Sequence, residues 1–358
     1  MKNSRLGIMT MLAWWHPLAV DQSWTFSCKD QHNFDVPWYI AYKMPREKGD
    51  TVGATEGTGF YYLDANDPSK LRPSPVSIDQ EHQAIGYTLS QYYSNVDDAN
   101  VLHVFYNDEP APKSLVQSDP KSVEKAHAKG VVLFDSASGS GIWLIHSVPK
   151  FPQPEGGYDY PEKQRVYAQT HLCLTLDAAQ INVIGQALYT NHPDIYSFTK
   201  PAWLDHIAPD LVKVLDGKYS SDSSASTLHT KISLVNALRF ELYAKSHLFD
   251  KDLWEDLVAV DIGEMEVETW RRGDLIEPHC SLSNTVVDVA AIKVGGTSFT
   301  YGKDHGKWGR TIDSKGATVC IGDINRMTTQ FKRGGGAVCI KNQQLWNAFD
   351  VVTKKHEC

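Results

Sequence analysis

The sequence has no low-complexity tract and, beyond its N-terminus, no run of 18 or more apolar residues. The first absence excludes a fibrous or largely disordered chain, and the second argues against a membrane span. No two cysteines form a C-x-x-C pair, which argues against a zinc knuckle or a thioredoxin-type redox site. What remains, with 42% apolar and 22% charged residues, is the composition of an ordinary globular protein.

The six cysteines and the N-terminus point to an oxidising compartment. An even number of cysteines favours three disulfides, although fifteen pairings are open from sequence alone. Lys2 and Arg5 precede a mostly apolar stretch from Leu6 to Val20. This pattern predicts a secretory signal peptide over residues 1–20, with a buried N-terminal segment as the alternative.

A shortage of positive charge argues against nucleic-acid binding at neutral pH, because the formal net charge is −8. The chain also has 14 histidines, and protonation of all of them would move the balance from −8 to about +6. Composition therefore hints at binding of a polyanion in acid.

One short motif occurs twice, at half-chain spacing. The first triplet is His127-Ala128-Lys129 and the second is His305-Gly306-Lys307; the histidines are 178 residues apart (305 minus 127) in a chain of 358. In a strand, an H-x-K triplet places imidazole and ammonium on one face, which suits attack on a phosphate. The duplication predicts a pseudo-dimer with one site between its halves.

Hydrophobic patterning predicts helices and strands in both halves. Strands are expected over 38–44, 57–63, 101–106, 130–134, 142–145, 285–294 and 318–321, and helices over 79–94, 178–188, 204–215 and 248–259. The run 130–134 is continuously apolar, as in a strand buried on both faces. Residues 151–161 and 220–227 are expected to be loops. The alternation indicates a layered α/β fold with a boundary near residue 175.

Longer motifs give a resemblance to a known family. They are Trp38-Tyr39-Ile40-Ala41-Tyr42-Lys43-Met44-Pro45, Phe105-Tyr106-Asn107-Asp108, the stretch from Ala126 to Pro152, His305-Gly306-Lys307-Trp308, Cys320-Ile321-Gly322-Asp323-Ile324-Asn325-Arg326 and Arg333-Gly334-Gly335-Gly336. In these segments the chain resembles deoxyribonuclease II, the acid, metal-independent endonuclease of the phospholipase D superfamily.

The resemblance implies a phospholipase D-like pseudo-dimer, in which each lobe is a β-sheet flanked by helices and the active site lies in the cleft between lobes. The expected lobes are residues 21–175 and 176–358. The family also implies the disulfides Cys28–Cys173, Cys280–Cys358 and Cys320–Cys339. The implied reaction is hydrolysis of DNA to 3′-phosphate and 5′-hydroxyl ends, with no cofactor and no metal.

Phosphodiester cleavage without a metal needs a nucleophile, donors for the phosphate oxygens and an acid for the leaving oxygen. We expect His127 to attack and form a phosphohistidine and His305 to act as the acid. Lys129, Lys307 and Asn325 are the expected donors. The family resemblance adds His146 as an assisting histidine. Asp135 and Asp313, six residues after the lysines, are predicted turn residues more than catalysts.

A basic, glycine-rich segment is a candidate for contact with the substrate backbone. Lys332, Arg333, Gly334 and Gly335 could form an anion nest, although a hairpin tip closed by a disulfide explains the same residues. Arg326, next to Asn325, is a further expected phosphate contact.

The chain contains no N-x-S/T sequon, which glycan-directed delivery to lysosomes would require. Secretion is therefore expected, with a lysosome or another acidic compartment as the alternative. The sequence leaves open whether the protein is a monomer or a homodimer. The competing functions are a phospholipase D-like lipid phosphodiesterase and a non-catalytic DNA-binding protein or toxin. A metal-dependent His/Asp nuclease is the mechanistic alternative.

Overall fold

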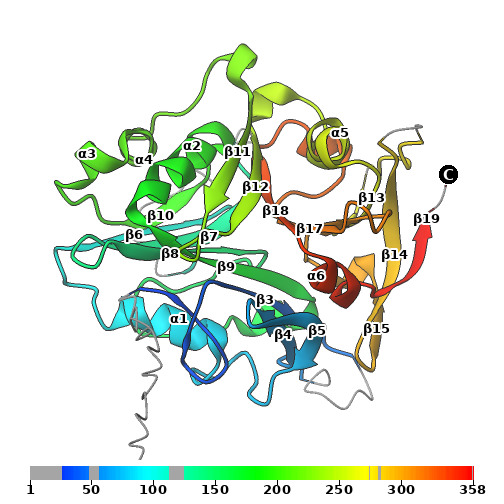
Figure 1. Ribbon diagram of the computed structural model, residues 1–358, viewed down its shortest axis with the longest axis horizontal. Helices are drawn as coiled ribbons and strands as arrows, with labels where there is room; N and C mark the ends of the chain where they lie inside the picture. The colour runs from blue at the N-terminus through cyan, green and yellow to red at the C-terminus, as the bar shows by residue number, and fades with distance from the viewer. Residues whose placement is uncertain (1–25, 48–55, 113–124, 274, 281–283, 357) are drawn as a thin grey trace, which may run out of the picture.

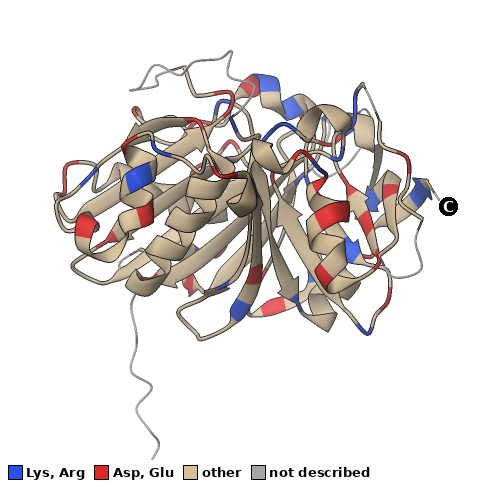
Figure 2. Ribbon diagram, turned by 90° about the horizontal axis from the view of Figure 1, so that it is seen from above, with Lys and Arg blue, Asp and Glu red and all other residues tan. Residues whose placement is uncertain are grey.

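Two large β-sheets form the framework of this mixed α/β protein (Figure 1). A computed structural model describes residues 26–47, 56–112, 125–273, 275–280, 284–356 and 358. Seen from above, the two halves diverge to either side of a central line, and acidic and basic residues are interspersed over both (Figure 2).

The first sheet has eight strands. In spatial order they are β10 (Ile195–Phe198), β6 (Val101–Asn107), β7 (Lys129–Asp135), β8 (Ser140–His146), β9 (Gln169–Asp177), β3 (Trp38–Lys43), β4 (Phe60–Asp64) and β5 (Asp67–Pro73). Every neighbouring pair in it is antiparallel. A separate two-stranded sheet pairs β1 (Cys28–Lys29) with β2 (Asp35–Val36).

The second sheet has nine strands. Its order is β11 (Thr227–Ser233), β12 (Arg239–Lys245), β18 (Gly335–Lys341), β17 (Thr318–Gly322), β16 (Trp308–Thr311), β13 (Met265–Glu268), β14 (Val286–Val294) and β15 (Thr297–Thr300), with β19 (Val352–His356) also paired to β14. Only the pairing of β13 with β14 is parallel among the strands described.

Six α-helices are described: α1 (Ala84–Tyr93), α2 (Ile181–Asn191), α3 (Leu204–Ile207), α4 (Pro209–Leu215), α5 (Ala259–Ile262) and α6 (Gln343–Ala348). A π-helix, Trp254–Val258, leads into α5. Helix α2 follows β9 of the first sheet yet contacts β11 and β12 of the second, while α6 follows β18 and contacts β5 of the first. The two sheets are therefore joined by reciprocal helix contacts.

The central strand β7 shows why the core has layers. All seven of its residues are buried, as the apolar run predicts. Because side chains alternate along a strand, Val131 and Leu133 enter the core beneath α1, and Val132 and Phe134 enter the core shared by both sheets. Burial on both faces fixes the register of β7, since a slip of one residue would exchange its two faces.

The three disulfides implied by the family resemblance are confirmed: Cys28–Cys173, Cys280–Cys358 and Cys320–Cys339. Each bridge links parts of the chain on the same side of residue 175. No helix in the described part of the chain is both long and apolar enough to cross a membrane. The predicted signal peptide, residues 1–20, lies outside the described residues.

The second half contains more β-structure than the sequence pattern predicts. The expected helix over 248–259 is divided into a 3-10 turn at His247–Phe249, the π-helix and α5. Residue 175 falls inside β9, and the chain returns to the first sheet once more as β10. If the halves are defined by sheet membership, the first half extends to Phe198, because β10 is hydrogen-bonded to β6 of the first sheet.

Candidate active site

The two triplets lie at matching places in the two sheets, where β7 and β16 begin. The His127 backbone N–H donates to the Gly334 carbonyl (2.9 Å), just before β18 of the second sheet. The His305 backbone N–H donates to the Ala168 carbonyl (2.8 Å), just before β9 of the first sheet. Each histidine is therefore tied to the opposite half, and segments far apart in sequence form one site.

The charges of the two triplets act on one another. Burial and the nearby ammonium of Lys129 together lower the pKa of Lys307 to about 7. Burial, together with Lys307 and Lys129, lowers the pKa of His305 to about 2. The pKa of His127 is also well below its usual value because of burial, Lys129 and Lys307. Both imidazoles are consequently neutral in the free protein at mildly acid pH.

Asp108, which follows β6, is the acidic centre of the site. It forms an ion pair with Lys129 and with Arg333 (3.1 Å), and its Oδ2 lies 3.8 Å from His127 Nε2. Burial alone would raise the pKa of Asp108, but Lys129, His127 and Arg333 hold it far below its usual range. The motif Phe105–Asp108 was part of the family resemblance, yet its aspartate was not predicted as a site residue.

The tautomer of His127 follows from its neighbour. Its Nδ1 lies 3.0 Å from the backbone carbonyl oxygen of Asp323. A carbonyl oxygen only accepts, so Nδ1 carries the proton and donates it. In the neutral ring, Nε2 therefore has a free lone pair and faces Asp108.

His305 is held in a different way, by aromatic rings. Tyr167 stacks on it with a centroid distance of 3.9 Å and an interplanar angle of 16°, and Trp270 lies at 4.5 Å. Its Nε2 is buried with no hydrogen-bond partner among the described residues. The two histidines thus share position but differ in surroundings: a carbonyl and a carboxylate for one, and aromatic faces for the other.

Three buried carboxyl groups near the second triplet hold protons at mildly acid pH. Burial raises the pKa of Asp304 to about 6 and that of Asp323 to about 7. Glu268 is fully buried, and its pKa is raised well above the usual value by burial and by Asp304. Sequence reasoning missed all three: the fold brings Glu268 of β13 and Asp323, which follows β17, beside the second triplet, whereas Asp304 directly precedes His305 in the sequence.

His146 and Asn325 are both buried, but they are not equivalent positions. The register pairs Gly130 with Ile145 and Trp308 with Ile321, so His146 corresponds to Gly322 and Asn325 lies beyond the strand. The His146 ring packs against His171 at 6.0 Å, and its pKa is lowered by burial, His171 and Lys129. The Asn325 Oδ1 has no hydrogen-bond partner within the described ranges.

Arg326 lies in a buried ion network instead of facing a substrate. Its side chain is 0% exposed and pairs with Asp288 (2.7 Å) and Glu255 (2.6 Å). It also donates to the Glu277 carbonyl (3.1 Å). A phosphate could reach this guanidinium only by displacing these partners, so the structure does not bring Arg326 together with the triplets.

The glycine-rich segment packs against α2 and against the residues that follow β17. A Cβ on Gly334 would lie 1.8 Å from the Asn191 carbonyl oxygen, and one on Gly335 would lie 2.7 Å from Asp323 Oδ1. Gly334 therefore permits close approach to α2, and Gly335 permits close packing within the second half. Arg333 donates to Asp108 and to the Ala126 carbonyl (3.0 Å). Lys332 is exposed.

Asp135 and Asp313 are turn residues, as predicted. The Asp135 carboxylate accepts from the amides of Ala137 (3.0 Å) and Ser138 (2.9 Å), and Asp313 accepts from Lys315 (2.8 Å). Both lie at the ends of β7 and β16 remote from the triplets.

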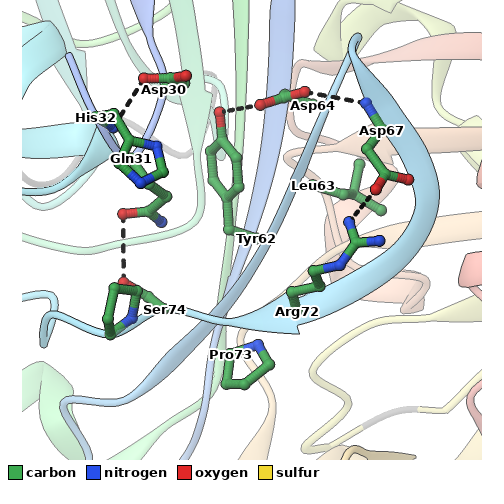
Figure 3. Close-up of a pocket in the computed structure, with 11 residues that line it drawn as sticks. Asp30, Gln31, His32, Tyr62, Leu63, Asp64, Asp67, Arg72, Pro73 and Ser74 are labelled. Carbon is green, nitrogen blue, oxygen red and sulfur yellow. Dashed lines mark hydrogen bonds and ion pairs between the residues drawn. The ribbon is translucent and has the colours of Figure 1, made fainter. Parts of the chain in front are cut away.

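A pocket of about 230 Å³ lies elsewhere, beside β4 and β5 (Figure 3). Its walls include His32, Tyr62, Asp64 and Arg72, and none of the predicted site residues lines it. Within the described ranges, no group of three or more His, Cys, Asp or Glu side chains is arranged to hold a metal ion.

Comparison with known proteins gives the chain its class and family. Residues 27–358 match the family described as Deoxyribonuclease II. Deoxyribonuclease-2 of Caenorhabditis elegans is 40% identical over 95% of this chain and 96% of its own. Plancitoxin-1 of Acanthaster planci is 34% identical over 95% of both chains. Deoxyribonuclease-2-alpha of Rattus norvegicus is 32% identical over 92% of this chain and 93% of its own.

The fold, the paired triplets and these relatives define a hydrolytic nuclease. The chain belongs to the Deoxyribonuclease II family.

Proposed function

We propose that the protein is an acid, metal-independent endonuclease that hydrolyses DNA to 3′-phosphate and 5′-hydroxyl ends through a phosphohistidine. The observation that carries the proposal is the pair of triplets, in which the backbone N–H of each histidine donates a hydrogen bond to the opposite half of the molecule. Two imidazoles and two ammonium groups in one site match the needs of phosphoryl transfer, which are in-line attack, charge neutralisation and a proton donor.

In the first step, His127 Nε2 attacks phosphorus and the P–O5′ bond breaks. The fixed Nδ1–H···O=C bond supports this role, because it leaves the Nε2 lone pair available. His305 gives its proton to the departing O5′; the approach of an anionic phosphate raises the pKa of this ring from its low value in the free protein. Water then attacks phosphorus, His305 takes up its proton, and the N–P bond breaks to release the 3′-phosphate.

Lys129 and Lys307 are the proposed donors to the non-bridging oxygens. Lys307 Nζ donates to the His305 carbonyl (2.7 Å) and Lys129 pairs with Asp108, so both ammonium groups are held in place before substrate binds. Such preorganised cations stabilise the transition state without reorganising at the moment of reaction. We assign supporting roles to His146 and Asn325. Lys332 and Arg333 are proposed to contact the phosphate backbone of the DNA.

We infer that the architecture is a phospholipase D-like pseudo-dimer with DNA bound between its halves. The reciprocal contacts of α2 and α6 and the matching positions of the triplets support this symmetry. Three disulfides support function outside the cytosol, in a secreted or lysosomal setting.

The test is digestion of plasmid DNA with EDTA at pH 5 and pH 7.5, followed by end-group analysis, for the wild type, His127→Ala and His305→Ala. We expect cleavage in EDTA at pH 5, 3′-phosphate ends, and less than about a tenth of wild-type activity in either variant, because one imidazole cannot serve both sides of the phosphate. Quenching in an alkaline denaturant should trap the 3′-phosphoryl end of the DNA on wild-type His127, because the N–P bond of phosphohistidine is stable in alkali and hydrolysed in acid. Activity that disappears with EDTA, or 5′-phosphate ends, would refute the mechanism.

A further inference from the structure

Two buried lysines outside the triplets bind the loops that support the histidines. In the first sheet, Lys43 is 0% exposed at the end of β3. Its ammonium donates to the carbonyls of Gln164 (2.8 Å), Arg165 (2.8 Å) and Tyr167 (2.5 Å). An ammonium has three N–H donors, so this set of acceptors satisfies all of them.

Lys245 repeats this arrangement in the second sheet. It is 1% exposed at the end of β12 and donates to the carbonyls of Gln330 (3.3 Å), Phe331 (2.7 Å) and Arg333 (2.7 Å). The registers match as well: Lys43 lies opposite Gln169 at the start of β9, and Lys245 lies opposite Gly335 at the start of β18.

Each bound loop serves the histidine of the opposite triplet. The loop on Lys43 carries Tyr167, which stacks on His305, and continues to Ala168, whose carbonyl accepts from the His305 amide. The loop on Lys245 carries Arg333, which binds Asp108 beside His127. It continues to Gly334, whose carbonyl accepts from the His127 amide.

We propose that Lys43 and Lys245 are a crossed pair of positioning residues, in which Lys43 of the first sheet orients His305 and Lys245 of the second sheet orients His127. The inference rests on the two-histidine mechanism proposed above. Without the lysine ammonium, three loop carbonyls lose the donor that they share. The loop can then shift, and with it Tyr167 in the first case or Arg333 in the second. A displacement of about 1 Å in a catalytic group typically costs about 10² in rate.

The test compares two substrates that differ in the leaving group. DNA loses an alkoxide that needs a proton, whereas thymidine 3′-(4-nitrophenyl phosphate) loses nitrophenolate, which leaves without one. Lys43→Met removes the donors while keeping most of the side-chain volume. It should lower the single-turnover rate of DNA cleavage about 10²-fold but the burst rate of nitrophenolate release less than about tenfold, following the profile of His305→Ala, because the burst reports the first step before His305 is needed as the base.

Lys245→Met should instead lower both of these first-step rates by similar factors, following the profile of His127→Ala. Lys341→Met, at an exposed position ending β18, is the matched control and should behave as the wild type. Thermal unfolding of each variant checks the fold. Should a lysine variant fail to fold, two other variants test the same connections. Tyr167→Leu removes the ring that stacks on His305 and should follow the Lys43→Met profile. Arg333→Met removes the contact with Asp108 beside His127 and should follow the Lys245→Met profile.

Either lysine variant with more than half of wild-type kcat on DNA would overturn the inference. So would equal loss on both substrates in both variants, or a Lys43→Met profile that follows His127→Ala. The proposed function has a separate failure, since it falls if His127→Ala and His305→Ala themselves remain active.

Discussion

The alkaline limit of activity should be set by Lys307. Lys307 is 2% exposed, and burial next to Lys129 lowers its pKa from 10.5 to about 7. A lysine is charged below its pKa, so Lys307 can neutralise a phosphate in acid and loses this ability as the pH rises through about 7. Replacing it with arginine, which stays protonated at every accessible pH, should remove this limit.

The magnitude follows from the titration. With a pKa of about 7, Lys307 is almost fully charged at pH 5, about one-tenth charged at pH 8 and about one-hundredth charged at pH 9. If only the charged form supports turnover, loss of this charge should lower kcat/KM by a further factor of about ten for each pH unit above 7, in addition to any slope that deprotonation of His305 produces. In Lys307→Arg this additional slope should disappear over the same range, whatever the absolute rate of the variant.

The assay is cleavage of a labelled duplex oligonucleotide in EDTA between pH 4.5 and 9 at constant ionic strength, because salt screens the attraction of the whole protein for DNA. Lys341→Arg serves as the control and should keep the wild-type profile. The assignment to Lys307 is refuted if the arginine variant retains the same alkaline limb, or if the wild type loses no activity until well above pH 8.

Three further changes test the site and the fold. Asp108→Asn should lower kcat about 10-fold to 100-fold without weakening DNA binding, because Lys129 and Arg333 lose their anchor while a negative charge is removed; separate kcat and KM values decide this. Burial lowers the pKa of His103 to about 4. Between pH 6.5 and pH 4 this histidine takes up a proton in the unfolded chain but not in the folded protein, so the free energy of unfolding should fall by about 3 kcal/mol over that range, with no effect above pH 6.5. Urea unfolding of His103→Gln should therefore show a smaller loss between pH 7 and pH 4 than the wild type shows. Replacing Cys320 and Cys339 with serine should lower the free energy of unfolding by about 2–5 kcal/mol, and an unchanged value would mean that the bridge adds no stability.

The sequence by itself determined the parts whose signals are local. The apolar run 130–134 specified a strand buried on both faces, because such composition fits few other environments. The two H-x-K triplets indicated the side chains that we propose to be reactive, since their spacing repeats at half the chain length. Family motifs identified the disulfide pairs, which residue counting alone left open among fifteen alternatives.

Only the tertiary structure decided what surrounds those side chains. Asp108 became the centre of an ion network and Arg326 was drawn into another, although the sequence suggested a phosphate contact for Arg326. The glycines at 334 and 335, for which the sequence allowed an anion nest or a hairpin tip, pack closely against Asn191 of α2 and against Asp323. Burial and long-range ion pairs set these outcomes, and they depend on which residues from distant parts of the chain the two sheets bring together.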